Sequence, residues 1–524
     1  MPAAFPAFEA VKVDYWALMP MLVVVGGALL GVLVEAFAPR AARHTVQVVL
    51  TSATLLLAFV SLILRSVDHQ VVTVGGSIAI DGPALFLQGA LLLMSFIAIL
   101  VMAERFGGVG GDAFTPMGAS TPGSSQEVEA ARAGYATSEV FPLTLLAVFG
   151  MMMFVAASDL ITMFVALEVL SLPLYVMTGI ARRRRLLSQE ASLKYFLLGA
   201  FSSAFFLFGA ALIYGFAGSV DLGVIAKVIA QGATPQDGLL VPGAVLLLIG
   251  LLFKVGAAPF HMWTPDAYQG APTPVTGFMA ACTKVAAFGA ILRLTYVGLE
   301  GSRWDWRLGV AAIAILTMVV GAVLSVTQTD IKRLLAYSSI AHAGFILVGV
   351  LAFSREAVSG VMFYLVAYGF TTIAAFAIVA MVRQGASEAA QISQWAGLGR
   401  RHPVVAAVFG FLLLAFAGIP LTSGFAAKFA AFAPAIATGG TAGVIMVIVG
   451  VLASAVTAYV YVRLIVLMYF SAPADTGEDD EVVALMPSVS TTIAVTVGVL
   501  VTLVLGVWPT KVLEIAQSAS QFLL

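Results

Sequence analysis

The chain alternates long apolar runs with short polar connections along most of its length. A helix needs about 20 apolar residues to cross a hydrocarbon core about 30 Å thick, and the runs reach that length repeatedly. The pattern predicts an all-α polytopic membrane protein of about 14 spanning helices, each bounded to within about two to four residues. The predicted segments are 15–37, 45–65, 82–103, 139–157, 159–180, 190–216, 240–262, 274–299, 307–327, 333–352, 357–382, 403–436, 441–470 and 488–508.

The seventh predicted segment contains residues that a continuous helix does not tolerate. Gly256, Pro259 and Pro265 follow Lys254 within a few turns. Each proline removes a backbone donor and clashes with the preceding turn. Because a broken membrane helix persists only where protein or water satisfies its freed backbone groups, we expect this break to line an internal polar cavity.

The twelfth segment repeats this feature, because Gly418 and Pro420 lie close to Lys428. The two disturbed segments are five apart, so segments 4–8 and 9–13 are predicted to be two copies of one five-helix unit. A unit with an odd number of spans must be inverted in its second copy, as in many ion transporters. Chance similarity between Gly- and Pro-rich membrane helices is the alternative. The predicted regions are 1–138, 139–300 for the first repeat, 301–470 for the second, and 471–524.

Composition agrees with a membrane protein and excludes several other classes. Hydrophobic residues make up 61% of the chain and charged residues 10%, with a mean hydropathy of +1.04. The net charge of -1, with basic residues confined to short loops, argues against a nucleic-acid partner. The single cysteine, Cys282, excludes a disulfide framework and an iron–sulfur cluster held by this chain alone. We find no dinucleotide fingerprint and no metal-ligand spacing, so no cofactor and no metal is expected.

Basic residues predict the orientation, since short cytoplasmic loops are enriched in Lys and Arg. The clearest marker is the run of four arginines at 182–185, between the fifth and sixth segments. Both termini are then predicted on the outer side, and segment 15–37 is expected to be a retained helix because no basic region precedes it. The residues predicted to share the cytoplasmic side with this run are Arg40, Arg43, Arg105, Arg132, Lys332, Arg333, Arg383, Arg400 and Arg401.

Three connections have distinctive compositions. The loop 107–138 is rich in Gly, Ser, Pro, Thr and Glu and is predicted to be flexible, with no catalytic features. The acidic run 475–481 is expected to be a solvated loop. Residues 221–231 are predicted to form a short amphipathic surface helix.

Few charged residues occur inside the apolar segments. A charge at the centre of a membrane helix costs about 2.5 to 3.5 kcal/mol on insertion scales, so such residues are expected to be functional. Ion pairs that only hold helices together are the alternative, but four lysines and one glutamate cannot neutralise one another. The five residues are Glu168, Lys194, Lys254, Lys284 and Lys428.

These residues are suited to moving protons. Burial disfavours the charged form of a lysine and a nearby carboxylate favours it, so the distance between Glu168 and its lysine would control where the proton resides. His261 and His342 could relay protons near neutral pH, although a membrane histidine is as often a packing residue. Tyr364 and Tyr368, about one turn apart, could extend a hydrogen-bonded chain, although core packing is the more common role.

Five motifs lie in or beside the predicted segments: EVLSLPLY at 168–175, LKYFLL at 193–198, FKVGAAPFHMWTPDAY at 253–268, DIKRLLAYSSIAH at 330–342 and PLTSGFAAK at 420–428. Together they resemble one family, the antiporter-like membrane subunits of respiratory complex I (NADH-quinone oxidoreductase). The resemblance covers most of the chain. Lysine rather than glutamate at position 428, tyrosines rather than histidines at 364 and 368, and an end soon after the last segment favour its N-type branch.

The resemblance implies a role for each candidate residue. Glu168 and Lys254 would form the pair of the first half-channel, and Lys284 would lead toward the centre. Lys428 would lead to the opposite side, and Lys194 would be a further polar residue on the route. NADH, FMN, iron–sulfur clusters and quinone would all lie in partner subunits. Those partners would include sibling antiporter-like subunits and small membrane subunits within a bacterial plasma membrane.

Two other functions fit the same residues. The chain could belong to a multi-subunit cation/proton antiporter that works without NADH. It could also be a structural membrane subunit whose buried charges only join helices. Co-purification with a flavin-containing arm tests the first alternative, and proton pumping by assembled variants tests the second.

Overall fold

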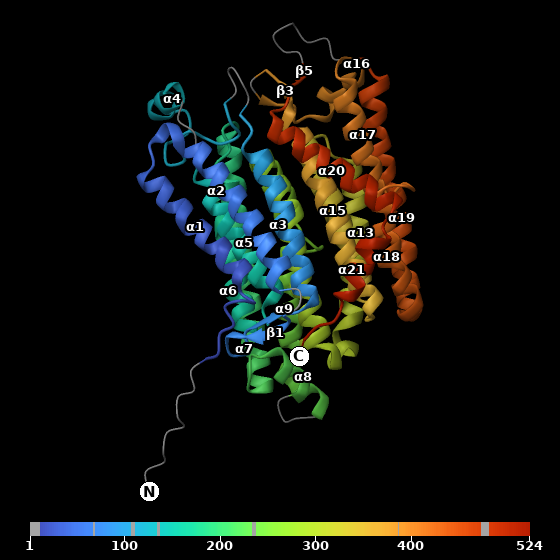
Figure 1. Cartoon of the computed structure of the whole chain (residues 1–524). Coiled ribbons are helices and arrows are strands. Elements are labelled where there is room, and N and C mark those ends of the chain that lie inside the picture. Colours follow the sequence, from blue (N-terminus) through green and yellow to red (C-terminus); the bar gives the residue numbers. More distant parts are fainter. Residues whose placement is uncertain are drawn as a thin grey trace.

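Helices that lie roughly parallel to one another form most of the molecule (Figure 1). The computed structural model describes residues 11–66, 69–105, 111–133, 137–232, 237–385, 387–472 and 482–523. The acidic run predicted at 475–481 lies outside the described residues, as do parts of the loop 107–138.

The N-terminal region contributes three long helices and a small hairpin. Asp81 caps the third helix, where its side chain accepts a hydrogen bond from the Ala84 amide. The elements are α1 (Met19–Phe37), α2 (Arg40–Ser61) with a π-helical turn (Leu62–Ser66), β1 (Val71–Thr73), a 3-10 turn (Val74–Gly76), β2 (Ile78–Ile80), α3 (Gly82–Met102) and the short α4 (Ser125–Arg132).

The next group of helices contains the first break. Helix α9 ends where Gly256 adopts a left-handed conformation with φ 75°, and helix structure resumes seven residues later. The elements are α5 (Val140–Ala156), α6 (Leu160–Thr178), α7 (Arg185–Ala217), α8 (Leu222–Gln231), a 3-10 turn (Asp237–Leu239), α9 (Leu240–Val255), α10 (Trp263–Gly270), α11 (Thr273–Phe278), a π-helical turn (Met279–Thr283), α12 (Lys284–Arg293), a second π-helical turn (Leu294–Gly298) and a 3-10 turn (Glu300–Ser302).

The second break divides the predicted segment 403–436 into two helices. Gly418 ends α17 with φ 81°, and α18 begins at Ser423. The elements are α13 (Arg303–Val326), α14 (Ile331–Val350), α15 (Arg355–Met381), β3 (Val382–Gln384), β4 (Ser387–Glu388), a 3-10 turn (Ile392–Trp395), α16 (Leu398–Arg401), α17 (Pro403–Ala417), α18 (Ser423–Thr438), α19 (Gly440–Phe470), β5 (Val482–Ala484), α20 (Val489–Val507) and α21 (Thr510–Ser518).

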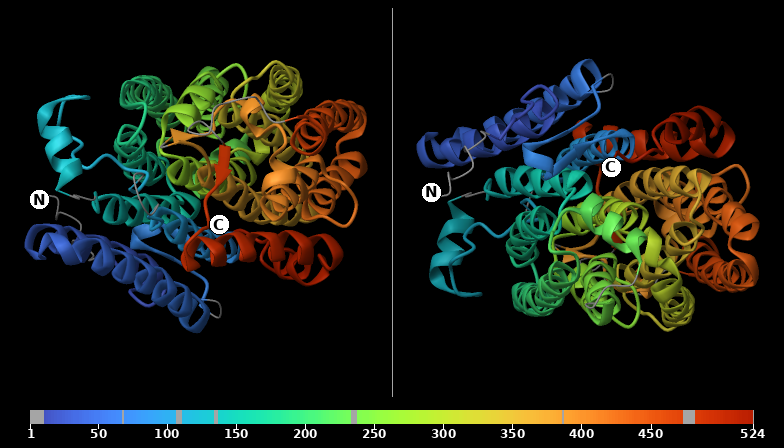
Figure 2. Two further views of the ribbon diagram at one scale, coloured as in Figure 1. Left: turned by 90° about the horizontal axis from the view of Figure 1, so that it is seen from above. Right: turned by 90° about the horizontal axis from the view of Figure 1, so that it is seen from below.

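Eleven helices among the described residues are long and apolar enough to cross a membrane. Helices α5, α9 and α17 are apolar but shorter, because the breaks divide two of the predicted segments. The helical stretch 273–298 and helices α14 and α15 are almost wholly enclosed by protein, whereas α1, α2 and α20 expose most of their surface. Figure 2 shows α1, α2 and α20 along one side of the bundle.

The described residues are mostly helical, as predicted, but they also form a few short strands. Strands β1 and β2 form an antiparallel hairpin, and β3 pairs with both β4 and β5. These strands are only two or three residues long and lie at the ends of the bundle (Figure 1). They connect helices without entering the bundle interior. The amphipathic helix predicted at 221–231 is confirmed as α8.

The described part of the loop 107–138 is more ordered than its composition predicts. Arg182 forms an ion pair with Asp112 at 2.6 Å, and Arg185 forms one with Glu127 of α4 at 3.0 Å. Partial burial alone would raise the pKa of the Glu127 carboxyl, but hydrogen bonds from the Gly123 amide and Arg185 lower it. The arginine run lies at one end of the bundle, and two of its arginines bind this loop.

Both described chain ends lie at the end of the bundle that carries the β1–β2 hairpin. The Asp14 amide donates to Thr73 of β1, and the Leu523 amide donates to Asp81 at the start of α3. Asp81 also forms a fully buried ion pair with Arg293 of α12, at 2.7 Å. Because Arg293 donates in addition to the Val155 carbonyl, this pair joins α3, α5, α12 and the C-terminal residues.

Candidate functional site

Lys254 lies in the last turn of α9, immediately before the first break, and its side chain is buried. Its ammonium group donates to the Ser171 hydroxyl at 2.8 Å and to the Tyr195 hydroxyl at 3.1 Å. A side chain at Gly256 would meet Thr264, so both the backbone conformation and the packing require glycine there. Helix α9 therefore ends close to the point where Lys254 contacts α6 and α7.

Glu168 lies three residues before Ser171 on α6 and is half-buried. Its carboxylate accepts a hydrogen bond from the Ser203 hydroxyl of α7. Glu168 and Lys254 bond to different hydroxyl groups, so the expected pair is not a direct ion pair in this conformation. Ser171, which accepts from Lys254, lies on the same helix as Glu168.

Lys194 differs from the other four candidates because 46% of its side chain is exposed. Its ammonium group forms ion pairs with Glu190 at 2.7 Å and with Asp266 at 3.0 Å. Asp266 also pairs with Arg333 at 2.7 Å. Partial burial alone would raise the pKa of the Asp266 carboxyl, but hydrogen bonds from Arg333 and Lys194 lower it. Lys194 thus belongs to a partly exposed charged cluster rather than to the buried set.

Lys284 occupies the most enclosed part of the molecule. It directly follows the π-helical turn Met279–Thr283, a helix irregularity often found at functional sites. Its ammonium group donates to the Ser339 hydroxyl of α14 at 2.5 Å and lies 5.7 Å from the ring centre of Tyr368. The hydroxyl of Tyr268 is 3.4 Å from the same serine oxygen.

His342 and Tyr364 form a hydrogen bond at 2.8 Å between the imidazole Nδ1 and the phenol oxygen. The His342 ring also packs 4.9 Å from that of Tyr368. The other imidazole nitrogen, Nε2, and the Ser423 hydroxyl are both buried, without a partner among the described residues, and line one small cavity of about 10 Å³. His261 lies apart, in the connection between α9 and α10, where its ring contacts Tyr337.

Lys428 is buried on α18 and reaches back to the end of α17. Its ammonium group donates to the carbonyls of Phe416 and Ala417, at 3.1 and 2.7 Å, and to the Ser454 hydroxyl at 2.6 Å. Carbonyls at a helix C-terminus lack intrahelical donors and attract positive charge. The second lysine thus follows its break, whereas Lys254 precedes the first.

Buried residues connect the three lysines in a continuous row. Hydrogen bonds join each lysine to a cluster of nearby oxygens, and contacts of aromatic rings join one cluster to the next; the last link is the hydrogen bond from Lys428 to the main-chain carbonyl of Phe416. In order, the row contains Lys254, Tyr195, Trp263, Tyr268, Ser339, Lys284, Tyr368, His342, Phe416 and Lys428.

The hydroxyl groups that contact the lysines are not among the residues predicted from the sequence. Ser171, Tyr195, Tyr268 and Ser339 lie inside the recognised motifs, but no pattern of charge or period distinguishes them from packing residues. Ser454 lies outside those motifs and carries no local signal. Only the packing of separate helices shows that these hydroxyls meet the ammonium groups.

No described residues form a group of three or more His, Cys, Asp or Glu that could hold a metal ion. Cys282 is buried, and its sulfur lies 3.7 Å from the Ser95 hydroxyl.

Known proteins share both the sequence and the fold. Residues 157–457 match the family model described as NADH:quinone oxidoreductase/Mrp antiporter, TM. NADH-quinone oxidoreductase subunit N of Rhodococcus opacus is 56% identical, over 98% of this chain and 97% of that protein. A chain of respiratory complex I from Thermus thermophilus is 32% identical with a TM-score of 0.74, over 95% of this chain and 99% of that one.

A chain of the Mrp complex from Dietzia has a TM-score of 0.78 but is only 21% identical, over 97% of both chains, so it shows the shared fold alone. The family model covers both kinds of protein, whereas the 56% identity over nearly the whole length of a subunit N separates the N-type branch from other proteins with this fold. The chain therefore belongs to the subunit N family of NADH-quinone oxidoreductase.

Proposed function

We propose that this chain translocates protons as a membrane subunit of a bacterial NADH:quinone oxidoreductase. The observation that carries the proposal is the buried row from Lys254 to Lys428, which holds three lysines bonded to hydroxyl or carbonyl oxygens. The similarity to complex I subunits supports an assembly in which partner subunits bind NADH, FMN, iron–sulfur clusters and quinone. Sibling membrane subunits would lie beside this chain.

The proton path would begin at Glu168 and Lys254 and end at Lys428. A buried ammonium group that lacks an adjacent carboxylate releases its proton more easily than one in an ion pair. Serine and tyrosine hydroxyls both accept and donate hydrogen bonds, so they can pass a proton onward. A movement that brings Glu168 against Lys254 would hold the proton, and their separation would release it toward Tyr195.

Lys284 would be the central station, with Ser339 and Tyr268 on one side and Tyr368, His342 and Tyr364 on the other. The aromatic contacts between clusters carry no hydrogen bond that could transfer a proton. We infer that transfer between clusters requires these rings to move. Lys194 and Asp266 would then lie at the partly exposed approach to the first cluster.

The proposed architecture has 14 membrane crossings, with inverted repeats at 139–300 and 301–470. Helices α9 and α17 support it, because each ends at a glycine break and they start at opposite ends of the bundle, near α8 and α16 (Figure 1). The flanking regions 1–138 and 471–524 would lie outside the repeats.

The proposed orientation places both termini outside the plasma membrane and the arginine run in the cytoplasm. Arg182, Arg183, Lys332 and Arg383 line one cavity, which supports a shared side for these clusters. Labelling of single cysteines introduced at Ser518 and at Arg400 with an impermeant maleimide tests this orientation. Labelling of the Arg400 position alone in intact cells would contradict it.

Proton pumping by the assembled enzyme tests the function. Lys284→Met removes the charge and keeps a long side chain, so NADH-driven pumping should fall by about a hundredfold while assembly persists. Lys511→Met is the matched control, because Lys511 is exposed on α21. Equal pumping by both variants would support a structural subunit instead, and purification without a flavin-containing arm would support the cation antiporter.

A further inference from the structure

A cavity of about 480 Å³ opens between α13 and α19, at the end of the bundle that carries the arginine run. The start of α14 and residues 391–393 complete its walls. Its volume falls within the range of about 300 to 1,000 Å³ that is usual for small-ligand sites. The buried row described above does not include its lining.

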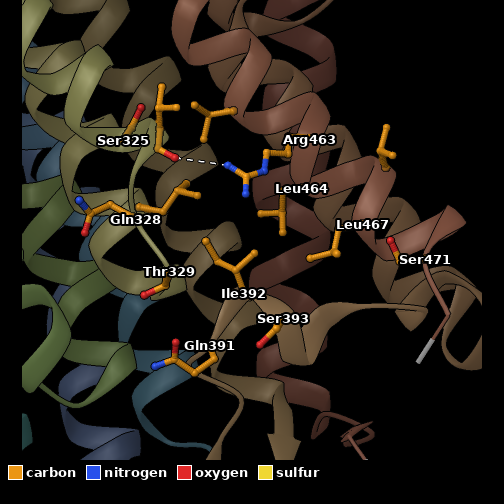
Figure 3. A pocket seen from close by; sticks show the side chains of 14 residues that line it. Ser325, Gln328, Thr329, Gln391, Ile392, Ser393, Arg463, Leu464, Leu467 and Ser471 are labelled. Carbon is orange, nitrogen blue, oxygen red and sulfur yellow. Dashed lines mark hydrogen bonds between the residues drawn. The ribbon is translucent and has the colours of Figure 1, made fainter. Parts of the chain in front are cut away.

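The lining has one charged residue, Arg463, and no acidic residue among those that the structure describes. The Arg463 guanidinium donates one long hydrogen bond, 3.4 Å, to the Val326 carbonyl, which Figure 3 marks with a dashed line. Its side chain is exposed. A guanidinium has five N–H donors in a planar fork, which matches the oxygens of a phosphate group.

Polar and apolar side chains both line the cavity (Figure 3). Thr329, Gln391 and Ser393 gather at one end, and Arg463 lies toward the other. Leu464 and Leu467 form part of the apolar wall. An amphiphile with a phosphate and a polar head group matches this arrangement better than a wholly apolar ligand does.

The depth of Arg463 fits the level of lipid phosphates. Helix α19 has 31 residues, so it is about 46 Å long and exceeds a hydrocarbon core of about 30 Å by about 8 Å at each end. Arg463 lies seven residues before Phe470, or about 10 Å from the helix end. Its long side chain can therefore reach the boundary between hydrocarbon and head groups.

Exposed apolar side chains continue from the cavity along both helices. They include Leu316, Val319 and Val323 on α13, which recur at helical spacing, and Val456 and Tyr459 on α19. Acyl chains of a lipid whose phosphate meets Arg463 would lie along these side chains.

We propose that this cavity binds one phospholipid with an anionic head group. The phosphate contacts Arg463, and the head group reaches Gln328, Gln391 and Ser393. A polyol head group such as glycerol supplies both donors and acceptors for these side chains. The site provides a fixed lipid contact at the junction of α13, α14 and α19.

The test compares the assembled enzyme carrying wild-type chain, Arg463→Gln or Arg400→Gln. Each preparation is stripped of lipid in detergent, and binding of phosphatidylglycerol and phosphatidylcholine with identical chains is measured by native mass spectrometry. Wild type should hold one phosphatidylglycerol about tenfold more tightly than phosphatidylcholine, and Arg463→Gln should lose this preference. Arg400→Gln should retain it, because Arg400 is exposed but lies outside the cavity.

Equal binding of the two lipids by wild type, or an unchanged preference in Arg463→Gln, would overturn the proposal. A second measurement uses only the wild-type enzyme, so its result does not depend on whether a variant folds. Photoactivatable phosphatidylglycerol added to the wild-type enzyme should label peptides from 316–334 and 456–471. Absence of label there, as expected if another protein chain covers the cavity, would also overturn it.

Discussion

Lys254, Lys284 and Lys428 are all buried, yet none has a carboxylate as its hydrogen-bond partner. Hydroxyl and carbonyl oxygens stabilise their ammonium groups less than an ion pair would. Each of these ammonium groups is bonded to neutral oxygens alone. The partly exposed Lys194 instead has two carboxylates beside it.

Lys254→Ala should leave the enzyme assembled and lower NADH-driven proton pumping by about a hundredfold, because the first cluster loses the group that holds the proton. Lys254→Arg should restore little pumping, since arginine does not release its proton at accessible pH. Pumping in proteoliposomes measures both effects, with Lys227→Ala on the surface helix α8 as the control. Normal pumping by Lys254→Arg would contradict a role in proton transfer.

Glu168→Gln should keep the hydrogen bond from Ser203, because the amide oxygen also accepts, but it removes the negative charge near Lys254. Turnover should fall about tenfold or more without loss of assembly. Glu168→Asp retains the charge and should keep part of the activity. The idea fails if Glu168→Gln pumps protons as fast as the wild type.

At the scale of elements, the two breaks place lysines where a continuous helix would not. Gly256 ends α9 two residues after Lys254, and Gly418 ends α17 so that its last carbonyls accept from Lys428. Leu421 also adopts a left-handed conformation, with φ 70°, so several residues share the second break. The break is a stable feature of the backbone rather than a kink at Pro420 alone.

Gly418→Ala tests the second break. A non-glycine residue at φ 81° costs about 1 to 2 kcal/mol, and the new Cβ would lie 3.0 Å from the Lys428 ammonium nitrogen. We expect pumping to decrease while the enzyme still assembles. Gly309→Ala, within α13 and with free space around it, is the control and should be silent. Equal pumping by both variants would show that the geometry at Gly418 is unimportant.

The attachment of α4 to the arginine run should depend on pH. Because the folded-state pKa of Glu127 lies below its ordinary value of 4.5, its contribution to stability is present above that value. The contribution is lost as the pH falls through the folded pKa. Glu127→Gln should reproduce that loss at neutral pH, with faster hydrogen exchange at the Gly123 amide, which donates to Glu127. Glu129→Gln, exposed on the same helix, should leave exchange unchanged.

At the scale of the whole molecule, the buried Asp81–Arg293 pair joins parts of the chain that are far apart in sequence. Asp81→Asn leaves the Arg293 charge buried without a counter-charge, which costs about 3 to 5 kcal/mol. We expect a large decrease in thermal stability and poor assembly. Glu514→Gln, in an exposed pair with Lys511, should change stability by about 1 kcal/mol or less. Similar melting temperatures for the two variants would contradict a stabilising role for the buried Asp81–Arg293 pair.

The membrane class, most of the helices, the two breaks and three buried lysines could be predicted from the sequence alone. These follow from local chemistry, because apolar length, glycine, proline and isolated charge act on the chain nearest to them. The motifs were sufficient to predict the family. The short strands and the helix within the loop 107–138 were not predicted. Their formation depends on strand pairing or ion pairs with residues far away in the sequence.

The contacts between side chains of different helices became apparent only from the folded structure. It placed Lys194 in an exposed cluster, left Glu168 and Lys254 on different hydroxyls, and set His261 apart from the row. It also brought Ser339 to Lys284 and Ser454 to Lys428, although no period or charge marks these serines. A serine hydroxyl can bond to a carbonyl of the preceding turn in its own helix, so the surrounding sequence does not specify its partner on another helix; the packing of the helices does.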